Sequence, residues 1–159
     1  MTTKGQAPIE LAHLFTLRAE LAAGLDAGDG PLGRRTLNAV QQGWFEGDRL
    51  KGTVNPGTGD WMLTRNDIRV VDARLVLQTD DGALIHMSYG GRIVFPQEVL
   101  GEMRDPKRRH LVDPSRYYFR TNPVFETGSP AYCWLNRIVS IARGELVEGG
   151  VKYEVYELL

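Results

Sequence analysis

A small set of carboxylates, arginines and aromatic side chains in this sequence could carry out acid/base chemistry. A carboxylate surrounded by aromatic side chains has a raised pKa, so it acts as a general base or acid near neutral pH. An Arg or Asn side chain beside it stabilises the oxygen of a developing enolate. The predicted catalytic residues are Asp60, Asp72, Arg74 and Glu126, and the predicted binding residues are Trp61, Arg120, Tyr132, Trp134 and Asn136.

One pair in this set also has a structural interpretation. Asp72 and Arg74 are two positions apart, so they share one face of a strand and could form an ion pair that ties strands together. Ion-pair networks perturb pKa values as active sites do. The sequence leaves both roles open for this pair.

The glycine-rich segment Gly28-Asp-Gly30-Pro-Leu-Gly33 has the spacing G-x-G-x-x-G. A dinucleotide site needs a helix directly after this motif, whereas residues 34–46 predict a strand. The favoured interpretation is a flexible turn.

Metal and thiol chemistry have little support in the sequence. His13, His86 and His110 are scattered and do not have metal-ligand spacing, so we predict neither a metal site nor a cofactor. Cys133 is expected to be a buried, inert thiol in a strand, and a single cysteine suits the reducing cytoplasm. The basic run 107–110 is either a solvated loop or a gate that attracts an anionic substrate.

These residues must be positioned by short strands, because turn residues recur at even spacing along the chain. Asp-Gly and Asn-Asp pairs suit hairpin turns, and evenly spaced strands are typical of a sandwich or a barrel. One longer connection, 96–115, contains a predicted short helix after Pro96 and is a lid or an insertion. The predicted strands are 14–21, 34–46, 48–54, 60–65, 68–78, 83–89, 116–125, 132–143 and 151–158.

Several of these strands combine an apolar face with a polar and aromatic face. In 68–78, one face carries Val71, Ala73, Leu75 and Leu77, and the other carries the Asp72–Arg74 pair. The polar faces either meet water, as in ordinary antiparallel sheets, or line a lumen that holds a ligand. In the second case the apolar faces would need cover, and we expect a homodimer.

Composition limits the remaining classes. The chain has 159 residues, which suits a single domain (11–159) after a short tail (1–10). A net charge of -1 argues against a nucleic-acid partner. No apolar run is long enough to span a membrane and the N-terminus lacks an apolar signal core, so we expect a cytoplasmic protein.

Several motifs in fixed order resemble the domain-of-unknown-function 3237 family, which is also called uncharacterised protein family 0311. The resemblance covers roughly residues 11–158. It implies an all-β chain with minor α content: an antiparallel barrel of about 8–10 strands, lipocalin-like or allene-oxide-cyclase-like, often dimeric. The matching segments include Pro31-Leu-Gly-Arg-Arg, Pro56-Gly-x-Gly-Asp-Trp61, Val71-Asp-Ala-Arg-Leu, Thr79-Asp-Asp-Gly-Ala-Leu-Ile85, Phe125-Glu-Thr-Gly and Tyr132-x-Trp-Leu-Asn136.

Three functions follow from this reading. The first is a cofactor-independent isomerase, cyclase or lyase that moves a proton on a small carbonyl or aromatic compound. The second is a non-catalytic barrel that binds a small organic acid, which a carboxylate neutralised by arginine would favour. The third is a structural or partner-binding module, which a filled barrel interior would favour.

Overall fold

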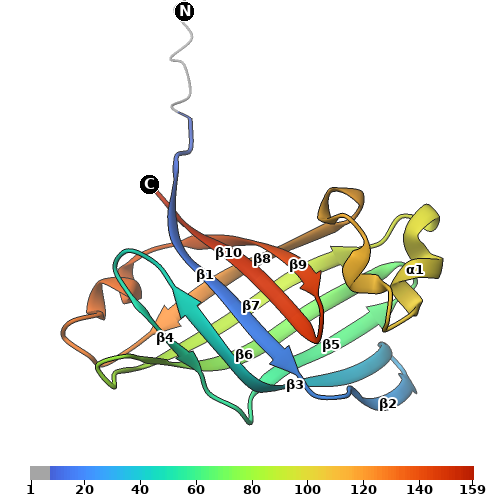
Figure 1. The fold of residues 1–159 in the computed structure, drawn as a ribbon, viewed down its shortest axis with the longest axis horizontal. Helices are drawn as coiled ribbons and strands as arrows, with labels where there is room; N and C mark the ends of the chain where they lie inside the picture. Colours follow the sequence, from blue (N-terminus) through green and yellow to red (C-terminus); the bar gives the residue numbers. More distant parts are fainter. Residues whose placement is uncertain (1–7) are drawn as a thin grey trace, which may run out of the picture.

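The computed structural model describes residues 8–159, so most of the expected tail lies outside the described residues. Ten antiparallel strands form one sheet that closes on itself (Figure 1). The strands are β1 Leu11–Leu21, β2 Leu25–Gly30, β3 Gly33–Glu46, β4 Lys51–Val54, β5 Gly59–Arg65, β6 Ile68–Thr79, β7 Leu84–Val94, β8 Tyr118–Glu126, β9 Ser140–Val147 and β10 Gly150–Leu158.

The closed part of the sheet is an eight-strand barrel, which confirms the predicted fold. β1 pairs with both β10 and β3, and this double pairing closes the barrel. The short strands β4 and β5 together fill the place between β3 and β6. β2 lies outside the closed ring and pairs only with β3.

The apolar strand faces point into the barrel. Val71, Ala73, Leu75 and Leu77 are all at most 2% exposed, whereas the alternate residues of β6 are mostly exposed. The structure therefore decides between the two expectations for the polar faces: they meet water and do not line the lumen. Since the apolar faces point inward, they need no partner subunit to cover them, and this reason for expecting a homodimer no longer applies.

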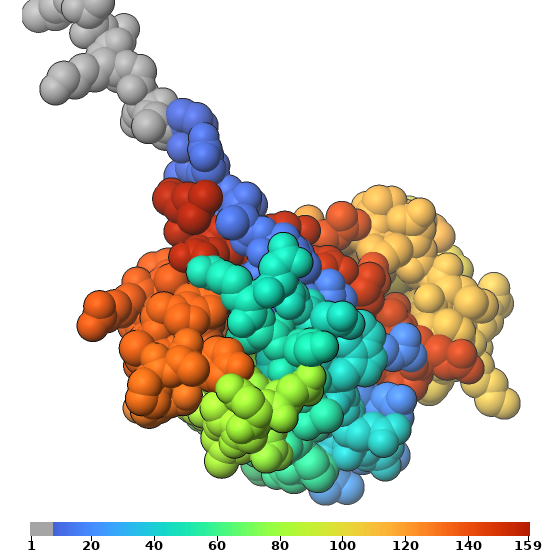
Figure 2. All heavy atoms as spheres, turned by 60° about the vertical axis from the view of Figure 1, so that its left-hand side comes forward, coloured from blue at the N-terminus to red at the C-terminus, as the bar shows by residue number. Residues whose placement is uncertain are grey.

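One end of the barrel is closed by three connections (Figures 1 and 2). The long connection after β8 contains a 3-10 helix, η4 Cys133–Arg137, whose Leu135 is fully buried in the core. The guanidinium of Arg49 lies 3.8 Å from the ring centre of Trp134, and the Tyr132 hydroxyl donates to Asp81 at 3.1 Å. These contacts join the β3–β4, β6–β7 and β8–β9 connections.

The other end carries the connection between β7 and β8, where the one α-helix of the described residues lies as predicted. Val99 and Met103 pack into the core from this connection. Its elements are η1 Gln97–Val99, α1 Leu100–Arg104, η2 Arg109–Leu111 and η3 Pro114–Arg116.

Two local predictions were wrong. The predicted strand 132–143 is η4 followed by β9, because the Asn136 side chain bonds both the amide and the carbonyl of Thr127 and holds this segment in a tight loop. Cys133 is consequently exposed and is not a buried strand residue. The glycine-rich segment, expected to be a flexible turn, forms the end of β2 and its hairpin; the register shifts between Asp26 and Gly28, and Gly28 has a φ of 78°.

Candidate functional site

Asp60 lies in the seam between β5 and β6, where the strand pairing is interrupted. Its Oδ1 accepts a hydrogen bond from the backbone N–H of Asp72 at 2.9 Å. In a regular ladder that N–H would bond the carbonyl of Trp61 opposite. The Trp61 carbonyl instead accepts from Nη1 of Arg35 at 2.8 Å. The carboxylate has thus replaced a backbone acceptor in the barrel wall.

The register places Asp60 on the inward face, in a row with side chains from three other strands. It pairs with Asn38 of β3 and with Ala73 of β6, and Ala73 pairs with Tyr89 of β7. Residues that pair directly share a face of the sheet, and both Ala73 and Tyr89 are buried. Because only a methyl group separates them in this row, Asp60 and Tyr89 approach each other inside the barrel.

Burial raises the pKa of Asp60 to about 6. The backbone amide of Asp72 lowers the pKa by bonding the ionised form, and the negative charge of the Asp72 carboxylate raises it. The positive charge of Arg35 lowers the pKa and is the smallest of these effects. This carboxyl therefore loses its proton close to neutral pH, as a general base or acid requires.

Two buried tyrosines accompany the carboxylate. The rings of Tyr89 and Tyr153 meet edge to face, with centroids 5.4 Å apart. Burial raises the pKa of both hydroxyls, and the charge of Asp60 contributes to each rise. Both tyrosines consequently keep their protons at physiological pH. Because the two hydroxyls also hydrogen-bond each other, one O–H of the pair is left to donate to a ligand.

A further polar atom faces the interior without a partner. Thr121 of β8 is 5% exposed, and its hydroxyl has no hydrogen bond within residues 8–159. It pairs with Gly91 of β7, two positions from Tyr89 on the same strand face. A buried hydroxyl without a partner costs free energy, so this part of the interior can accept a polar group of a ligand or a water molecule.

The barrel is less tightly covered next to Asp60. Thr36 and Met62, which lie two positions along the inward faces of β3 and β5, are only partly buried. The carboxylate thus lies at the edge of the filled apolar core, beside side chains that are only partly buried. Two hollows described by the structure, of about 200 and 490 Å³, lie on the outer surface, and Asp60 lines neither of them.

The structure does not bring the predicted catalytic residues together. Only Asp60 faces the interior. Asp72 and Arg74 form an exposed ion pair on the outer face, with 3.2 Å between Nη1 and Oδ1, but both belong to β6, so the pair does not tie strands together as the structural interpretation expected. Glu126 is exposed, opposite His86 on the outer face, and lines one of the outer hollows.

The predicted binding residues also lie away from Asp60. Trp61 is 49% exposed and Arg120 is exposed on the outer face of β8. Tyr132, Trp134 and Asn136 belong to the closed end described above, where each has a structural contact. These three residues lie in or directly before η4 and not in the predicted strand 132–143.

Sequence reasoning missed Tyr89, Tyr153, Thr121 and Asn38. A signal was present, because the inward series Ile85, Met87, Tyr89 and Val151, Tyr153, Val155 place a tyrosine among aliphatic residues. Their meeting depends on the shear of the barrel, which the sequence does not display.

Three further expectations concern metal binding, membrane crossing and the basic run 107–110. The His, Cys, Asp and Glu side chains of residues 8–159 form no group of three that could hold a metal ion. Among the same residues, no helix has the length and apolar character that a membrane crossing requires. The basic run 107–110 is largely exposed.

Comparison with known proteins defines the family. The profile of the family described as "Protein of unknown function (DUF3237)" matches residues 9–158. The chain belongs to this family. A relative called a UPF0311 protein, from Rhodopseudomonas palustris, is 31% identical over 152 residues, covering 95% of this chain and 97% of the relative.

Solved structures show the same fold as this DUF3237 chain. A β-barrel-like protein from Acinetobacter baumannii has a TM-score of 0.84 at 32% identity, covering 99% of this chain and 100% of that one. A protein described as an enzyme from Penicillium herquei has a TM-score of 0.74 at 18% identity, covering 99% of both chains. At that identity the second likeness is one of fold.

Proposed function

We propose that this DUF3237 protein is a cofactor-independent acid/base enzyme, an isomerase, cyclase or lyase that acts on a small carbonyl or aromatic compound. The observation that carries the proposal is Asp60, an inward carboxylate with a pKa of about 6 beside two buried, neutral tyrosines. A base poised near neutral pH and hydrogen-bond donors for a developing oxyanion are the two parts that such chemistry needs.

The proposed step is a proton transfer on the bound compound. Asp60, ionised above pH 6, takes a proton from a carbon next to a carbonyl group, and the electron pair of that C–H bond moves onto the carbonyl oxygen. Tyr89 or Tyr153 donates a hydrogen bond to this oxygen and keeps its own proton. Asp60 then returns the proton to another atom, which gives an isomerised or cyclised product, or a leaving group departs.

The arginines are not needed in this scheme. Arg74 and Arg120, the groups first expected to hold the oxyanion, are on the outer face, and the tyrosine hydroxyls take that role. The binding-barrel alternative expects an arginine to neutralise the carboxylate and lower its pKa. Arg35 has only the smallest influence on Asp60, and the pKa is raised, which favours the enzyme.

The fungal enzyme is consistent with this proposal at the level of fold. It is described as an enzyme and has the same barrel, but barrels of one fold carry many functions. The support for catalysis therefore comes from Asp60 and its neighbours. A cytoplasmic location and a homodimer remain proposals, which cell fractionation and light scattering would test.

Isotope exchange tests the proposal without knowledge of the natural substrate. The protein is incubated in D₂O with a panel of small ketones, enones and hydroxylated aromatic compounds, and NMR measures the deuterium that enters each compound. We expect Asp60→Asn to slow exchange by about 100-fold or more, since general-base catalysis contributes that much. The matched control is Asp67→Asn, an exposed aspartate in the turn after β5, and it should exchange like the wild type.

Two outcomes would contradict the proposal. One is equal exchange by the Asp60→Asn and wild-type proteins. The other is tight binding of a panel compound, seen as a raised melting temperature, with no exchange or conversion by the wild type. The second outcome would establish the binding barrel instead.

A further inference from the structure

Three arginines stand side by side on the outer face of the barrel, across β7, β8 and β9. The register pairs Arg92 directly with Arg120, and Arg120 directly with Arg143. All three side chains are exposed, while their strand neighbours Ile93, Phe119 and Ala142 are buried. Since neighbouring strands are about 4.8 Å apart, three positive charges occupy a row about 10 Å long.

One carboxylate continues this row, because Glu154 of β10 pairs directly with Arg143 in the register, but the two side chains form no ion pair. Within residues 8–159, none of the three arginines forms an ion pair. Nη1 of Arg92 donates to the Gly91 carbonyl at 2.8 Å, and Nη1 of Arg120 donates to the Phe119 carbonyl at 2.9 Å. These bonds hold the two guanidinium groups against the sheet and leave their other N–H groups without a hydrogen-bond partner among residues 8–159.

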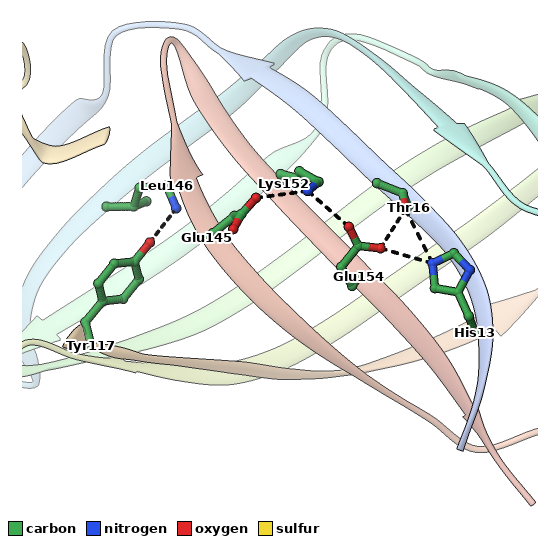
Figure 3. Close-up of polar contacts among 7 residues, drawn as sticks. All are labelled: His13, Thr16, Tyr117, Glu145, Leu146, Lys152 and Glu154. Atoms are coloured by element: carbon green, nitrogen blue, oxygen red, sulfur yellow. Dashed lines mark hydrogen bonds and ion pairs between the residues drawn. The ribbon is translucent and has the colours of Figure 1, made fainter. Parts of the chain in front are cut away.

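The nearest carboxylates are already engaged by other groups. Arg143 lines the outer hollow of about 200 Å³ together with Glu145, Lys152 and Glu154. Lys152 lies 3.1 Å from both carboxylates, and Glu154 also bonds Thr16 and His13, as Figure 3 shows.

A third carboxylate, Asp113, is close enough to Arg143 to sense its charge. Asp113 accepts the Ser115 amide at 2.8 Å, and the hydrogen bonds from Ser115 are the main reason that its pKa is lowered. Arg143 therefore remains an unpaired cation at the edge of the hollow.

Like charges directly opposite one another destabilise a sheet, so a row of this kind is unfavourable in the empty protein. A multivalent anion would reverse that effect, because guanidinium groups bind the oxygens of a phosphate in pairs. We propose that the Arg92–Arg120–Arg143 row is a binding site for a phosphate-type anion, in which a phosphate or diphosphate group bridges Arg120 and its neighbours. This site is on the outside of the barrel and is independent of the proposed chemistry at Asp60.

Calorimetric titration of the full chain tests the site, with sodium chloride keeping the ionic strength constant. The probes are inorganic phosphate, inorganic diphosphate and glycerol 2-phosphate. We expect the wild type to bind diphosphate, and Arg120→Gln and Arg143→Gln each to weaken binding at least tenfold. The matched control is Arg137→Gln, an exposed arginine of η4 outside the row, which should bind like the wild type.

The pattern of affinities decides the result. Equal affinity for inorganic phosphate and glycerol 2-phosphate supports a site for the bare group, and tighter binding of the ester supports a site for an organic phosphate. The proposal is overturned if no probe binds, or if the two row variants bind diphosphate as the wild type and Arg137→Gln do. If one row variant fails to fold, the other still gives the answer.

Discussion

The surroundings of Asp60 in the folded protein disfavour its ionised form. The folded chain partly buries the carboxylate, and among residues 8–159 one backbone amide bonds it directly. Its pKa of about 6 compares with an ordinary value of 3.8, so the folded state binds this proton more tightly than the unfolded chain does. By linkage, Asp60 lowers the free energy of unfolding as the pH rises from about 4 to about 6, and the loss is complete above that window.

Asp60→Asn should therefore stabilise the protein at neutral pH. The amide oxygen can still accept the Asp72 amide, but it carries no buried charge. We expect a gain of roughly 2 kcal/mol at pH 7.5, which shrinks toward pH 4 where the wild-type carboxyl is protonated. Urea unfolding of both proteins at several pH values measures this. A constant difference at all pH values would show that Asp60 has no raised pKa.

At this scale the sequence predicted Asp60 but not its surroundings. Trp61 is next to Asp60 in the sequence, but adjacent strand residues point to opposite faces, so Trp61 is on the outer surface and does not surround the carboxylate. The side chains that do surround Asp60, such as Tyr89 and Tyr153, come from β7 and β10. Only the closure and shear of the barrel bring those strands together with β5.

Strand packing next to the site depends on the absence of a side chain at Gly144 of β9. A Cβ atom there would lie 2.7 Å from the ring of Phe119, which is fully buried. The Phe119 ring in turn meets the ring of Tyr153, with centroids 5.4 Å apart. Gly144 thus determines where Phe119, and through it Tyr153, can lie.

Gly144→Ala is expected to destabilise the protein by about 1–3 kcal/mol, because the ring must move into a packed core. Thermal unfolding measures the loss, and Gly101→Ala is a suitable control because its Cβ would meet nothing within 4 Å. Equal melting temperatures for the two variants would contradict this account of the packing.

Most strands could be predicted from the sequence because alternation and turn residues agree. β6 is the clearest case. The Asn66-Asp67 pair directly before this strand forms the expected turn, and Asn66 has a positive φ of 56°. The segment 132–138 alternates in the same way, yet it forms η4. Its conformation is decided by Asn136 and Leu135, which contact residues outside the segment, and local patterning cannot represent such contacts.

Among the described strands, one has an unpaired edge. Every strand of the closed ring pairs on both sides, whereas β2 pairs only with β3 and is mostly exposed. Backbone amides open most easily where few buried apolar contacts hold them. We expect amides of β2 to exchange with D₂O much faster than those of β1 and β7, as hydrogen exchange resolved by mass spectrometry would show. Equal protection of β2 and β1 would indicate a partner that covers this edge, such as a second copy of the chain.

The hydrogen bond between Asp60 and the Asp72 amide connects the two sides of the barrel wall. Asp60 faces inward, while the Asp72 side chain is exposed and paired with Arg74. When Asp60 takes a proton, it becomes a weaker acceptor, and the backbone at Asp72 loses part of its hold on β5. A proton transfer inside the protein thus alters the strength of a hydrogen bond in the barrel wall itself.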